Sequence, residues 1–493
     1  MQNKFYITTA IDYPSSNPHL GHAYEKLCAD VLARWNRLLG KQVFFLTGTD
    51  EHGLKIMRAA QKAGLTPQAF VDRQSEKFKE LCSLWNISYD RFIRTTEKQH
   101  IKVAQQIFKK IYEKGDIYLG TYTGKYCADC ETFYTEKDLI DGKCPVHGKE
   151  CELVSEESYF FRLSKYKEKV IEYIEKNDLS IWPAGKKEEI KNRLKQDLLD
   201  LSVSRTSFDW GVPVPINPKH VQYVWIDALI NYISGVDYPN EQFKKFWPAD
   251  VHLIGKDIVW HHTVIWWSIL MAANIELPKT VLVHGFIQTE SGEKMSKSKG
   301  NVIDPIELAK NYNIDSIRYY LIREIPFGED GYFSEEKLIE RHNTELANDL
   351  GNLVNRTLAM TERYFSGVVP AGSLDVELKE KLNLEKVKQH MQKFELHLAL
   401  AEIMSFVKAC NQYINEKEPW KKQGKELSDI IYTLVEALRA IAILLHAFMP
   451  ASSEKIANAL SIEVKSIEDV FSEKGLAGKK VTKPRILFQK INR

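Results

Sequence analysis

The stretch Asn17-Pro18-His19-Leu20-Gly21-His22 lies between the first predicted strand and the first predicted helix, and it decides the fold class. Before it, residues 4–9 (Lys-Phe-Tyr-Ile-Thr-Thr) are rich in the aromatic and β-branched side chains of buried strands. After it, apolar residues recur at helical spacing over residues 20–39, and Gly40 ends the helix. A second strand is predicted over residues 43–46. Strand, helix and strand in this order predict a doubly wound parallel α/β sheet.

His19 and His22 fall in the first turn of that predicted helix, where free backbone N–H groups and the positive end of the helix dipole favour an anion. Gly21 has no side chain, so a flat adenine or a phosphate chain can approach the backbone closely. A chance metal pair is the alternative, but the segment offers no third ligand at a suitable spacing. The segment therefore predicts a nucleotide site.

A second motif, Lys294-Met295-Ser296-Lys297-Ser298, lies in a run with glycines at positions 292 and 300. Its two lysines can place two ammonium groups on one polyanion while the loop opens and closes. Taken alone, such a pentamer is most often a solvated turn. Together with the histidine segment, it indicates the triphosphate of a nucleotide as the ligand.

Length and composition limit what such a site belongs to. At 493 residues, the chain should hold about two to four domains. The hydrophobic fraction of 44% and charged fraction of 27% are ordinary for a globular protein, and a net charge of +2 gives no argument for nucleic-acid binding. We find neither an apolar run of about 18 residues nor a secretory signal. We therefore expect a cytoplasmic protein without a membrane partner.

Four of the seven cysteines lie between Cys127 and Cys151, which in a chain of this size argues for a metal rather than for disulfides. Cys127-Ala128-Asp129-Cys130 and, thirteen residues later, Cys144-Pro145-Val146-His147 have the spacing of tetrahedral zinc knuckles. We predict one structural Zn²⁺ per chain, held by Cys127, Cys130, Cys144 and His147. Cys151 either replaces His147 or remains a free thiol, and the spacing favours His147.

Later segments extend the predicted sheet. A strand over residues 251–254 runs into Gly255-Lys256-Asp257, and a carboxylate just beyond a strand end is where such sheets bind ribose. From Ala347 to about residue 460, helical periodicity dominates and predicts an α-helical bundle appended to the sheet.

The chain resembles the methionyl-tRNA synthetases, a class I aminoacyl-tRNA synthetase family, over essentially its whole length. The resemblance rests on His19-Leu20-Gly21-His22, Gly48-Thr49-Asp50-Glu51-His52-Gly53, the cysteine knuckles, Val224-Trp225-Ile226-Asp227-Ala228, Gly255-Lys256-Asp257 and the lysine motif. It implies an α/β fold whose Rossmann-like parallel sheet is split by a zinc-knuckle insertion and followed by a C-terminal α-helical bundle.

The expected domains follow from the same resemblance. Residues 1–114 and 221–280 would form the two halves of the nucleotide-binding catalytic domain, with residues 115–220 as the connective insertion between them. Residues 281–346 would hold the lysine loop and contact the tRNA stem, and residues 347–493 would form the α-helical anticodon-binding domain.

The resemblance also implies roles for individual residues. The catalytic residues would be Lys294, Lys297, His19 and His22, and ATP would contact His19, Gly21, His22, Gly255, Asp257, Lys294 and Lys297. Methionine would lie among Ile11, Tyr13, Asp50, Trp225, Ala228, Tyr232, Ile258, His262 and Trp266, with Asp50 on its ammonium group. The anticodon would be read by Asn352, Arg356 and Trp420.

An aromatic pocket suits a thioether, since sulfur–ring contacts contribute about 0.3–1.5 kcal/mol. The alternative is that Trp225, Tyr232 and Trp266 are ordinary core residues. The chain departs from the family pattern at Asp12, where many relatives carry tyrosine, at Leu229, where some carry proline, and at His261, where phenylalanine is frequent.

The implied activity is that of a methionine–tRNA ligase. The methionine carboxylate attacks the α-phosphorus of ATP, giving methionyl-adenylate and pyrophosphate, and the 3′ end of tRNA(Met) then displaces AMP. No covalent enzyme intermediate is needed, and the lysines and histidines act electrostatically, with Mg²⁺ accompanying ATP. The partners are thus ATP, L-methionine and tRNA(Met), and we expect a monomer.

Three other classes fit the motifs less well. A leucine, isoleucine or valine synthetase should carry a far larger editing insertion. A small-molecule nucleotidylyltransferase has no need for the helical bundle. A non-catalytic RNA-binding relative would be expected to lose the lysines at positions 294 and 297, and both are present.

Overall fold

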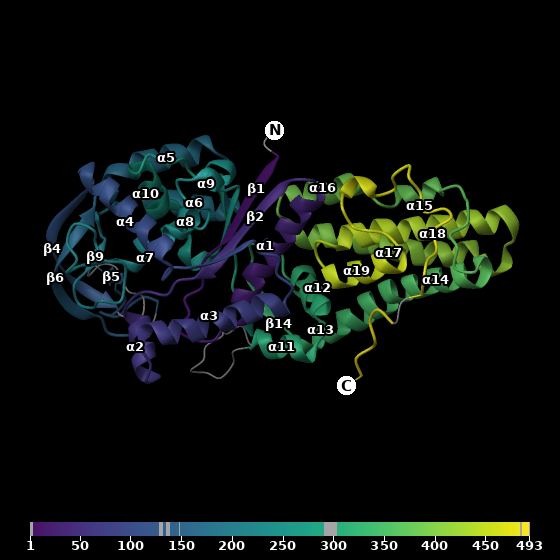
Figure 1. Cartoon of the computed structure of the whole chain (residues 1–493), viewed down its shortest axis with the longest axis horizontal. Helices are drawn as coiled ribbons and strands as arrows, with labels where there is room; N and C mark the ends of the chain where they lie inside the picture. The colour runs from purple at the N-terminus through teal and green to yellow at the C-terminus, as the bar shows by residue number, and fades with distance from the viewer. Residues whose placement is uncertain are drawn as a thin grey trace.

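The computed structural model describes residues 3–127, 132–134, 139–146, 148–289, 303–483 and 486–492. Lys294, Lys297, Cys130 and His147, all predicted site residues, lie outside these ranges. An α/β part occupies one end of the elongated molecule and a helical part the other (Figure 1).

A six-stranded sheet forms the centre of the α/β part, and every neighbouring pair of its strands is parallel. In spatial order the strands are β3 (Arg91–Arg94), β2 (Gln42–Thr49), β1 (Lys4–Thr9), β11 (Val251–Gly255), β12 (Thr280–His284) and β7 (Ile181–Trp182). The order reverses between β1 and β11, so a crevice opens there at the carboxyl ends of the strands. The predicted parallel α/β sheet is confirmed.

Helix α1 (Leu20–Leu38) follows β1 and packs against the sheet. It begins at His19, whose backbone is extended and whose side chain caps the first turn. It is buried along nearly its whole length, and the buried positions include the charged residues Glu25, Lys26, Asp30 and Arg34. Charged side chains are almost never fully buried unless they are paired, so each of these four requires a partner.

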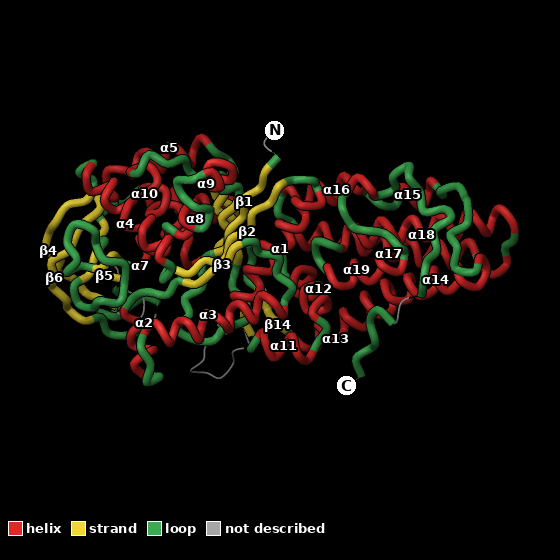
Figure 2. Tube along the Cα trace, viewed as in Figure 1, coloured by secondary structure: helices red, strands yellow, loops and turns green. Residues whose placement is uncertain are grey.

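The chain between β3 and β11 folds largely outside the parallel sheet. A four-stranded antiparallel sheet is made of β5 (Thr132–Tyr134), β4 (Ile117–Cys127), β6 (Glu152–Phe161) and β8 (Leu201–Ser202). It lies at the end of the molecule farthest from the helical part (Figure 2). Strand β7, from the same stretch, returns to the edge of the parallel sheet.

Shorter elements complete the α/β part and lead to the helical part. The helices are α2 (Leu54–Lys62), α3 (Pro67–Leu84), α4 (Lys98–Glu113), α5 (Lys167–Lys176), α6 (Ala184–Leu194), α7 (Val224–Leu229), α8 (Asn231–Ser234), α9 (Glu241–Phe246), α10 (Trp266–Ala272), α11 (Pro305–Asn311), α12 (Ile314–Glu324) and α13 (Glu335–Arg341). The small strand pairs are β9 (Ser204–Arg205) with β10 (Val221–Gln222), and β13 (Ile287–Thr289) with β14 (Gly331–Phe333).

The helical part contains α14 (Asn352–Phe365), α15 (Val376–Glu380), α16 (Leu384–Gln392), α17 (Leu396–Lys417), α18 (Gly424–Leu445) and α19 (Pro450–Ala459). The long helices α17 and α18 pack against each other and against α14. The predicted C-terminal helical region is confirmed. No helix in the described ranges is both long enough and apolar enough to cross a membrane.

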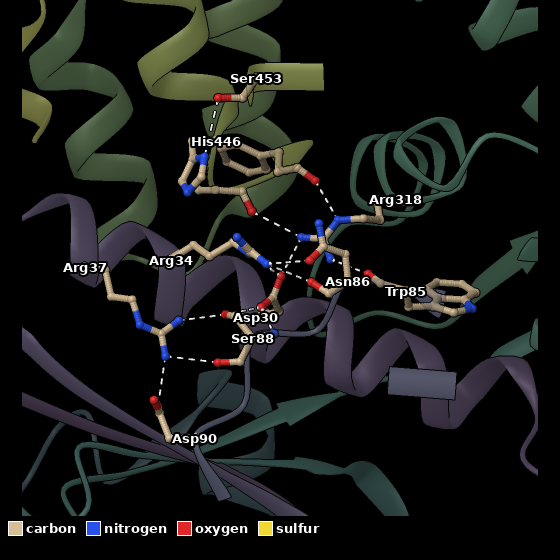
Figure 3. A network of polar contacts seen from close by, with 12 residues as sticks. Asp30, Arg34, Arg37, Trp85, Asn86, Ser88, Asp90, Arg318, His446 and Ser453 are labelled. Carbon is tan, nitrogen blue, oxygen red and sulfur yellow. Dashed lines mark hydrogen bonds and ion pairs between the residues drawn. The ribbon is translucent and has the colours of Figure 1, made fainter. Parts of the chain in front are cut away.

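A buried network of charges joins α1 to the helical part (Figure 3). Asp30 Oδ2 accepts from Arg34 Nε at 2.8 Å and from Arg318 Nη2 at 2.7 Å. Arg318, on α12, also donates to the backbone carbonyls of Trp85 at 3.0 Å and Phe448 at 2.9 Å. One guanidinium therefore contacts α1, the end of α3 and the turn between α18 and α19.

Candidate active site

The two histidines at the start of α1 form a stacked pair with defined proton positions. The Gly21 N–H donates to Nδ1 of His19 and the His19 N–H donates to Nδ1 of His22, each at 3.1 Å. The ring centroids are 3.6 Å apart. An imidazole nitrogen that accepts a hydrogen bond carries no proton, so each neutral ring carries its proton on Nε2. The pair therefore presents two N–H donors, a suitable arrangement for phosphate oxygens.

A side chain at either of two glycines would crowd a predicted ATP residue. A Cβ on Gly21 would lie only 3.0–3.1 Å from the His19 ring, and a Cβ on Gly255 would lie 2.9 Å from Asp257 Oδ1. Gly255 ends β11, the direct neighbour of β1. The histidine motif thus follows β1 and the Gly255 motif follows β11, so both come after the carboxyl ends of two adjacent strands.

Four of the predicted methionine residues form one aromatic cluster. The Tyr232 hydroxyl donates to Nε2 of His262 at 2.7 Å, while Nδ1 of His262 donates to the Ile258 carbonyl at 2.9 Å. The Tyr232 ring lies 5.9 Å from that of Trp266, and the Trp225 ring lies 6.3 Å from that of His262. Burial lowers the pKa of His262 to about 4, so this ring is neutral at pH 7.

The remaining pocket residues lie around this cluster. Ile11, Tyr13 and Ile258 pack against the same hydrophobic core, and Ala228 is buried in α7 one turn after Trp225. Asp50, just beyond β2, is held by its backbone N–H, which donates to the Asp12 carbonyl at 2.8 Å.

At one of the departures from the family pattern, His261 stacks on Trp225. Its ring lies 3.9 Å from that of Trp225, with an interplanar angle of 19°. Burial lowers the pKa of His261 to about 3, so the ring stays neutral as an aromatic partner.

A buried triad beneath the pocket was not predicted from the sequence. Asp227 accepts from His52 Nδ1 at 2.6 Å and from His100 Nε2 at 2.7 Å, and His100 Nδ1 lies 2.8 Å from the Ser234 hydroxyl. Burial raises the pKa of Asp227, but the two histidines outweigh it and lower the pKa to about 2. The triad fixes α7, with its pocket residues, to the segment after β2. His52 and Asp227 lie in family motifs, whereas nothing in the sequence marked His100.

The cysteine region brings together a set of thiols that differs from the predicted one. Cys127, Cys144 and Cys151 are buried in one small cluster. The predicted ligands Cys130 and His147 lie outside the described residues. Within the described ranges, no group of three or more potential ligand side chains is arranged to hold a metal ion.

The predicted anticodon residues lie on α14 and in the turn that follows α17. Asn352 is exposed at the start of α14, and Arg356, one turn later, donates from Nη2 to Asn415 Oδ1 on α17 at 2.9 Å. Trp420 follows α17 in a short 3₁₀ turn, and half of its surface is exposed (50%). An exposed tryptophan beside polar groups is available for stacking with an unpaired base.

Family models match most of the chain. One described as "tRNA synthetases class I (M)" matches residues 5–153 and 136–358, and one described as "Anticodon-binding domain of tRNA ligase" matches residues 381–483.

Relatives match over nearly the full length. The methionine–tRNA ligases of Caldanaerobacter subterraneus and Clostridium tetani are each 49% identical to this chain, covering 100% and 99% of it and 80% and 78% of their own lengths. The structure of Mycobacterium tuberculosis methionyl-tRNA synthetase in complex with methionyl-adenylate superposes with a TM-score of 0.94 at 40% identity, covering 98% of this chain and 99% of that one.

The apo form of that M. tuberculosis enzyme superposes with a TM-score of 0.87 at 36% identity, over 100% of this chain and 99% of that one. Whole-length identity of this size, together with the histidine pair, the aromatic cluster and the helical part, shows that the chain belongs to the methionyl-tRNA synthetase family of class I tRNA synthetases.

Proposed function

We propose that this chain is a methionine–tRNA ligase that activates L-methionine with ATP and passes it to tRNA(Met), with the residue roles given below. The observation that carries the proposal is the stacked pair of Nε2–H donors of His19 and His22 at the start of α1, the helix that follows β1 where the strand order of the sheet reverses. The aromatic cluster of Tyr232, Trp266, Trp225 and His262 has the right chemistry for a thioether.

In the first step, a methionine carboxylate oxygen attacks the α-phosphorus of ATP and pyrophosphate leaves. Charge builds up on the phosphate oxygens, and the Nε2–H groups of His19 and His22 donate to them. Lys294 and Lys297 stabilise the pentacovalent phosphate and the departing pyrophosphate, and Asp257 accepts from a ribose hydroxyl. Bound Mg²⁺ would neutralise further phosphate charge.

In the second step, a hydroxyl of the terminal ribose of the tRNA attacks the methionyl carbonyl carbon and AMP leaves. Neither step forms a bond to the protein, so the residues act by binding, orientation and charge. Asp50 takes the methionine ammonium, and the pocket of Ile11, Tyr13, Trp225, Ala228, Tyr232, Ile258, His262 and Trp266 takes the thioether chain.

The helical part supplies tRNA selection. Asn352 and Arg356 share one face of α14 because they are four residues apart. The contact of Arg356 with Asn415 directs that face towards the end of α17, from which Trp420 extends. We propose that Trp420 stacks on an anticodon base while the asparagine and arginine hydrogen-bond to base edges.

We also propose one structural Zn²⁺ held by Cys127, Cys130 and Cys144, with His147 or Cys151 as the fourth ligand. The burial of three reduced thiols in one cluster supports a thiolate site, and the position of Cys151 within that cluster strengthens its candidacy. The metal would fold the tip of the antiparallel sheet and would take no part in catalysis, because four protein ligands leave no open position.

Metal analysis of Cys151→Ser and His147→Ala, purified without chelator, identifies the fourth ligand, because only loss of a true ligand should deplete the zinc. Cys410→Ser, a buried free cysteine in the helical part, is the control and should keep the metal. Protein that contains no zinc at all would contradict the proposal.

ATP–pyrophosphate exchange with each amino acid in turn tests the activity. We expect exchange with methionine alone. Lys297→Ala should cut the exchange rate strongly while leaving methionine affinity nearly unchanged, because its charge acts mainly in the transition state. Lys109→Ala, an exposed lysine on α4, is the control and should behave as the wild type. Collapse of methionine binding in Lys297→Ala would give the loop a structural role.

Trp420→Ala tests the tRNA assignment. Stacking of a base on an aromatic ring contributes roughly 1–3 kcal/mol, so tRNA charging should fall by about tenfold to a hundredfold. Pyrophosphate exchange should be nearly unchanged, and Tyr112→Ala, a part-exposed ring on α4, should leave both rates alone. Equal losses in both half-reactions would mean that Trp420 only supports the fold.

We also propose that the protein is a monomer, and sedimentation at micromolar concentration tests this proposal.

A further inference from the structure

Asp12 is held rigidly against the carboxyl end of β2. Its N–H donates to the Gly48 carbonyl at 2.9 Å, and its own carbonyl accepts from the Asp50 N–H at 2.8 Å. Asp12 also forms an isolated parallel bridge with Thr49. The side chain is only 5% exposed, so the carboxylate cannot turn out to solvent.

The two oxygens of this carboxylate have different neighbours on α1. Oδ2 forms an ion pair with Lys26 Nζ. Oδ1 lies 3.9 Å from Nε2 of His22, longer than a hydrogen bond but close enough for electrostatic attraction. Because Nδ1 of His22 accepts from the His19 backbone, Nε2 carries the proton, and this nitrogen lies within electrostatic range of the Asp12 carboxylate.

A carboxylate at this position poses a problem for a site that binds a triphosphate, because it repels the ligand. Lys26 is completely buried and forms an ion pair with Asp12, so its positive charge offsets this repulsion. Burial lowers the pKa of Lys26, but Asp12 and Glu25 outweigh this effect and raise the pKa above its ordinary value. Glu25 itself pairs with His284 at 3.0 Å. The ammonium therefore remains charged at neutral pH.

A buried ion pair contributes little to stability compared with apolar residues of the same size, because both charges lose their water. Stability therefore does not explain why this ion pair is buried here. Its place beside His22, a proposed phosphate-binding residue, gives a functional reason.

We propose that Asp12 is a positioning residue that holds the His22 ring for adenylate formation, and that Lys26 cancels the charge of Asp12 so that the phosphates of ATP can bind beside it. The inference rests on the proposed ATP site at the start of α1. It assigns a function to two residues outside the histidine motif, one of them at a position where relatives carry tyrosine.

The test uses Asp12→Asn, Lys26→Met and the double variant, with KM and kcat measured in ATP–pyrophosphate exchange. Lys26→Met removes the cation that opposes burial of the Asp12 carboxyl group, so at a pH at which this group is ionised KM for ATP should rise by about tenfold while KM for methionine changes little. The double variant has no unpaired charge and should regain the KM for ATP. Its kcat should stay low, because His22 has lost its anionic neighbour.

Lys4→Met is the matched control. Lys4 is a buried lysine paired with Asp250 at 3.6 Å, at the opposite end of β1 from the crevice. Its loss should lower the midpoint of thermal unfolding without a selective effect on KM for ATP. Equal changes in KM for ATP in Lys4→Met and Lys26→Met would overturn the inference, as would a double variant that keeps the raised KM.

If Lys26→Met does not fold, the kcat of the double variant tests the inference. A double variant with the same kcat as the wild type would overturn the positioning role of Asp12. Failure of the inference is distinguishable from failure of the proposed function. Suppose that the wild-type protein exchanges pyrophosphate with methionine but the variants do not follow this pattern. That result overturns only the roles of Asp12 and Lys26. Wild-type protein without exchange overturns the function.

Discussion

Helix α1 carries two buried charge clusters that differ in how completely their polar atoms are satisfied. Deep in the helix, Asp30 accepts four hydrogen bonds, from the backbone and hydroxyl of Ser88, from Arg34 and from Arg318. Near its start, Lys26 Nζ and Asp12 Oδ2 have their mutual ion pair, but neither atom has a well-formed hydrogen bond to the described part of the chain. The Asp30 cluster holds α1 against α12, because all its charges are paired by hydrogen bonds. The Asp12–Lys26 cluster leaves polar atoms with unfilled hydrogen-bonding capacity near the start of α1.

The pKa values of the two carboxyl groups show the same difference. Burial raises the pKa of both. At Asp30, the charges of Arg318 and Arg34 and the bonds from Ser88 outweigh burial, and the pKa ends below its ordinary value. At Asp12, Lys26 alone opposes burial, and the pKa ends above its ordinary value. Burial to the same depth therefore has opposite results, depending on how many donors surround the carboxylate.

The largest expected effect comes from breaking the satisfied cluster. Asp30→Ala leaves two buried guanidinium groups without their carboxylate, which should lower the free energy of unfolding by about 3–5 kcal/mol. Denaturant unfolding followed by circular dichroism measures it. Asp12→Ala, the matched change in the outer cluster, should cost clearly less. A smaller loss for Asp30→Ala than for Asp12→Ala would reverse the comparison.

The second effect is the pH dependence of the deeper cluster. The pKa of Asp30 is depressed in the folded protein, so its stabilisation is fully present above the unfolded-state pKa of about 3.9. It is lost as the pH falls below that value through the folded-state pKa. The difference in free energy of unfolding between wild type and Asp30→Asn should thus be constant from about pH 7 to 5 and shrink below about pH 4. A difference that grows on acidification would contradict the depressed pKa.

The smallest effect is expected at the exposed margin of the same network. Arg37 donates to Asp90 at 2.9 Å and to the Ser88 hydroxyl at 2.6 Å, but the Arg37 and Asp90 side chains are about one-third exposed (32% and 37%). Arg37→Met should therefore cost no more than about 1 kcal/mol. Arg34→Met, three residues away and buried against Asp30, should cost more in the same denaturant experiment.

Much of the α/β framework follows from local rules. The strand predicted over residues 4–9 and the helix predicted over residues 20–39 match β1 and α1 within a residue, because a β-branched run and an apolar period of 3.6 leave few alternatives. The strand predicted over residues 43–46 is the middle of β2, which extends to Thr49. The family and the activity were also predicted correctly, because the motifs have distinctive spacings.

The charge clusters could not be predicted, because their partners meet only in three dimensions. In the sequence, Lys26 and Arg34 lie at helical positions typical of a solvent-exposed face. Arg318, which pairs with Asp30, is 288 residues away in the chain. The roles of Lys294, Lys297, Cys130 and His147 stay predictions, since these residues lie outside the described ranges. Sequence spacing favoured His147 over Cys151, whereas the buried thiol cluster includes Cys151, a proximity that arises from the pairing of β4 with β6.

The contacts of Arg318 with the turn before α19 limit how far the protein can be shortened by engineering. Its guanidinium donates to the carbonyls of Phe448 and Ala447, so the turn before α19 completes the surroundings of a charge that is paired with Asp30 on α1. A shortened adenylating fragment that stops before α18 would leave this cation facing an unfilled surface. Such a fragment would need an apolar replacement at position 318 and a neutral one at position 30, and the helix that presents His19 and His22 would otherwise lose its anchor.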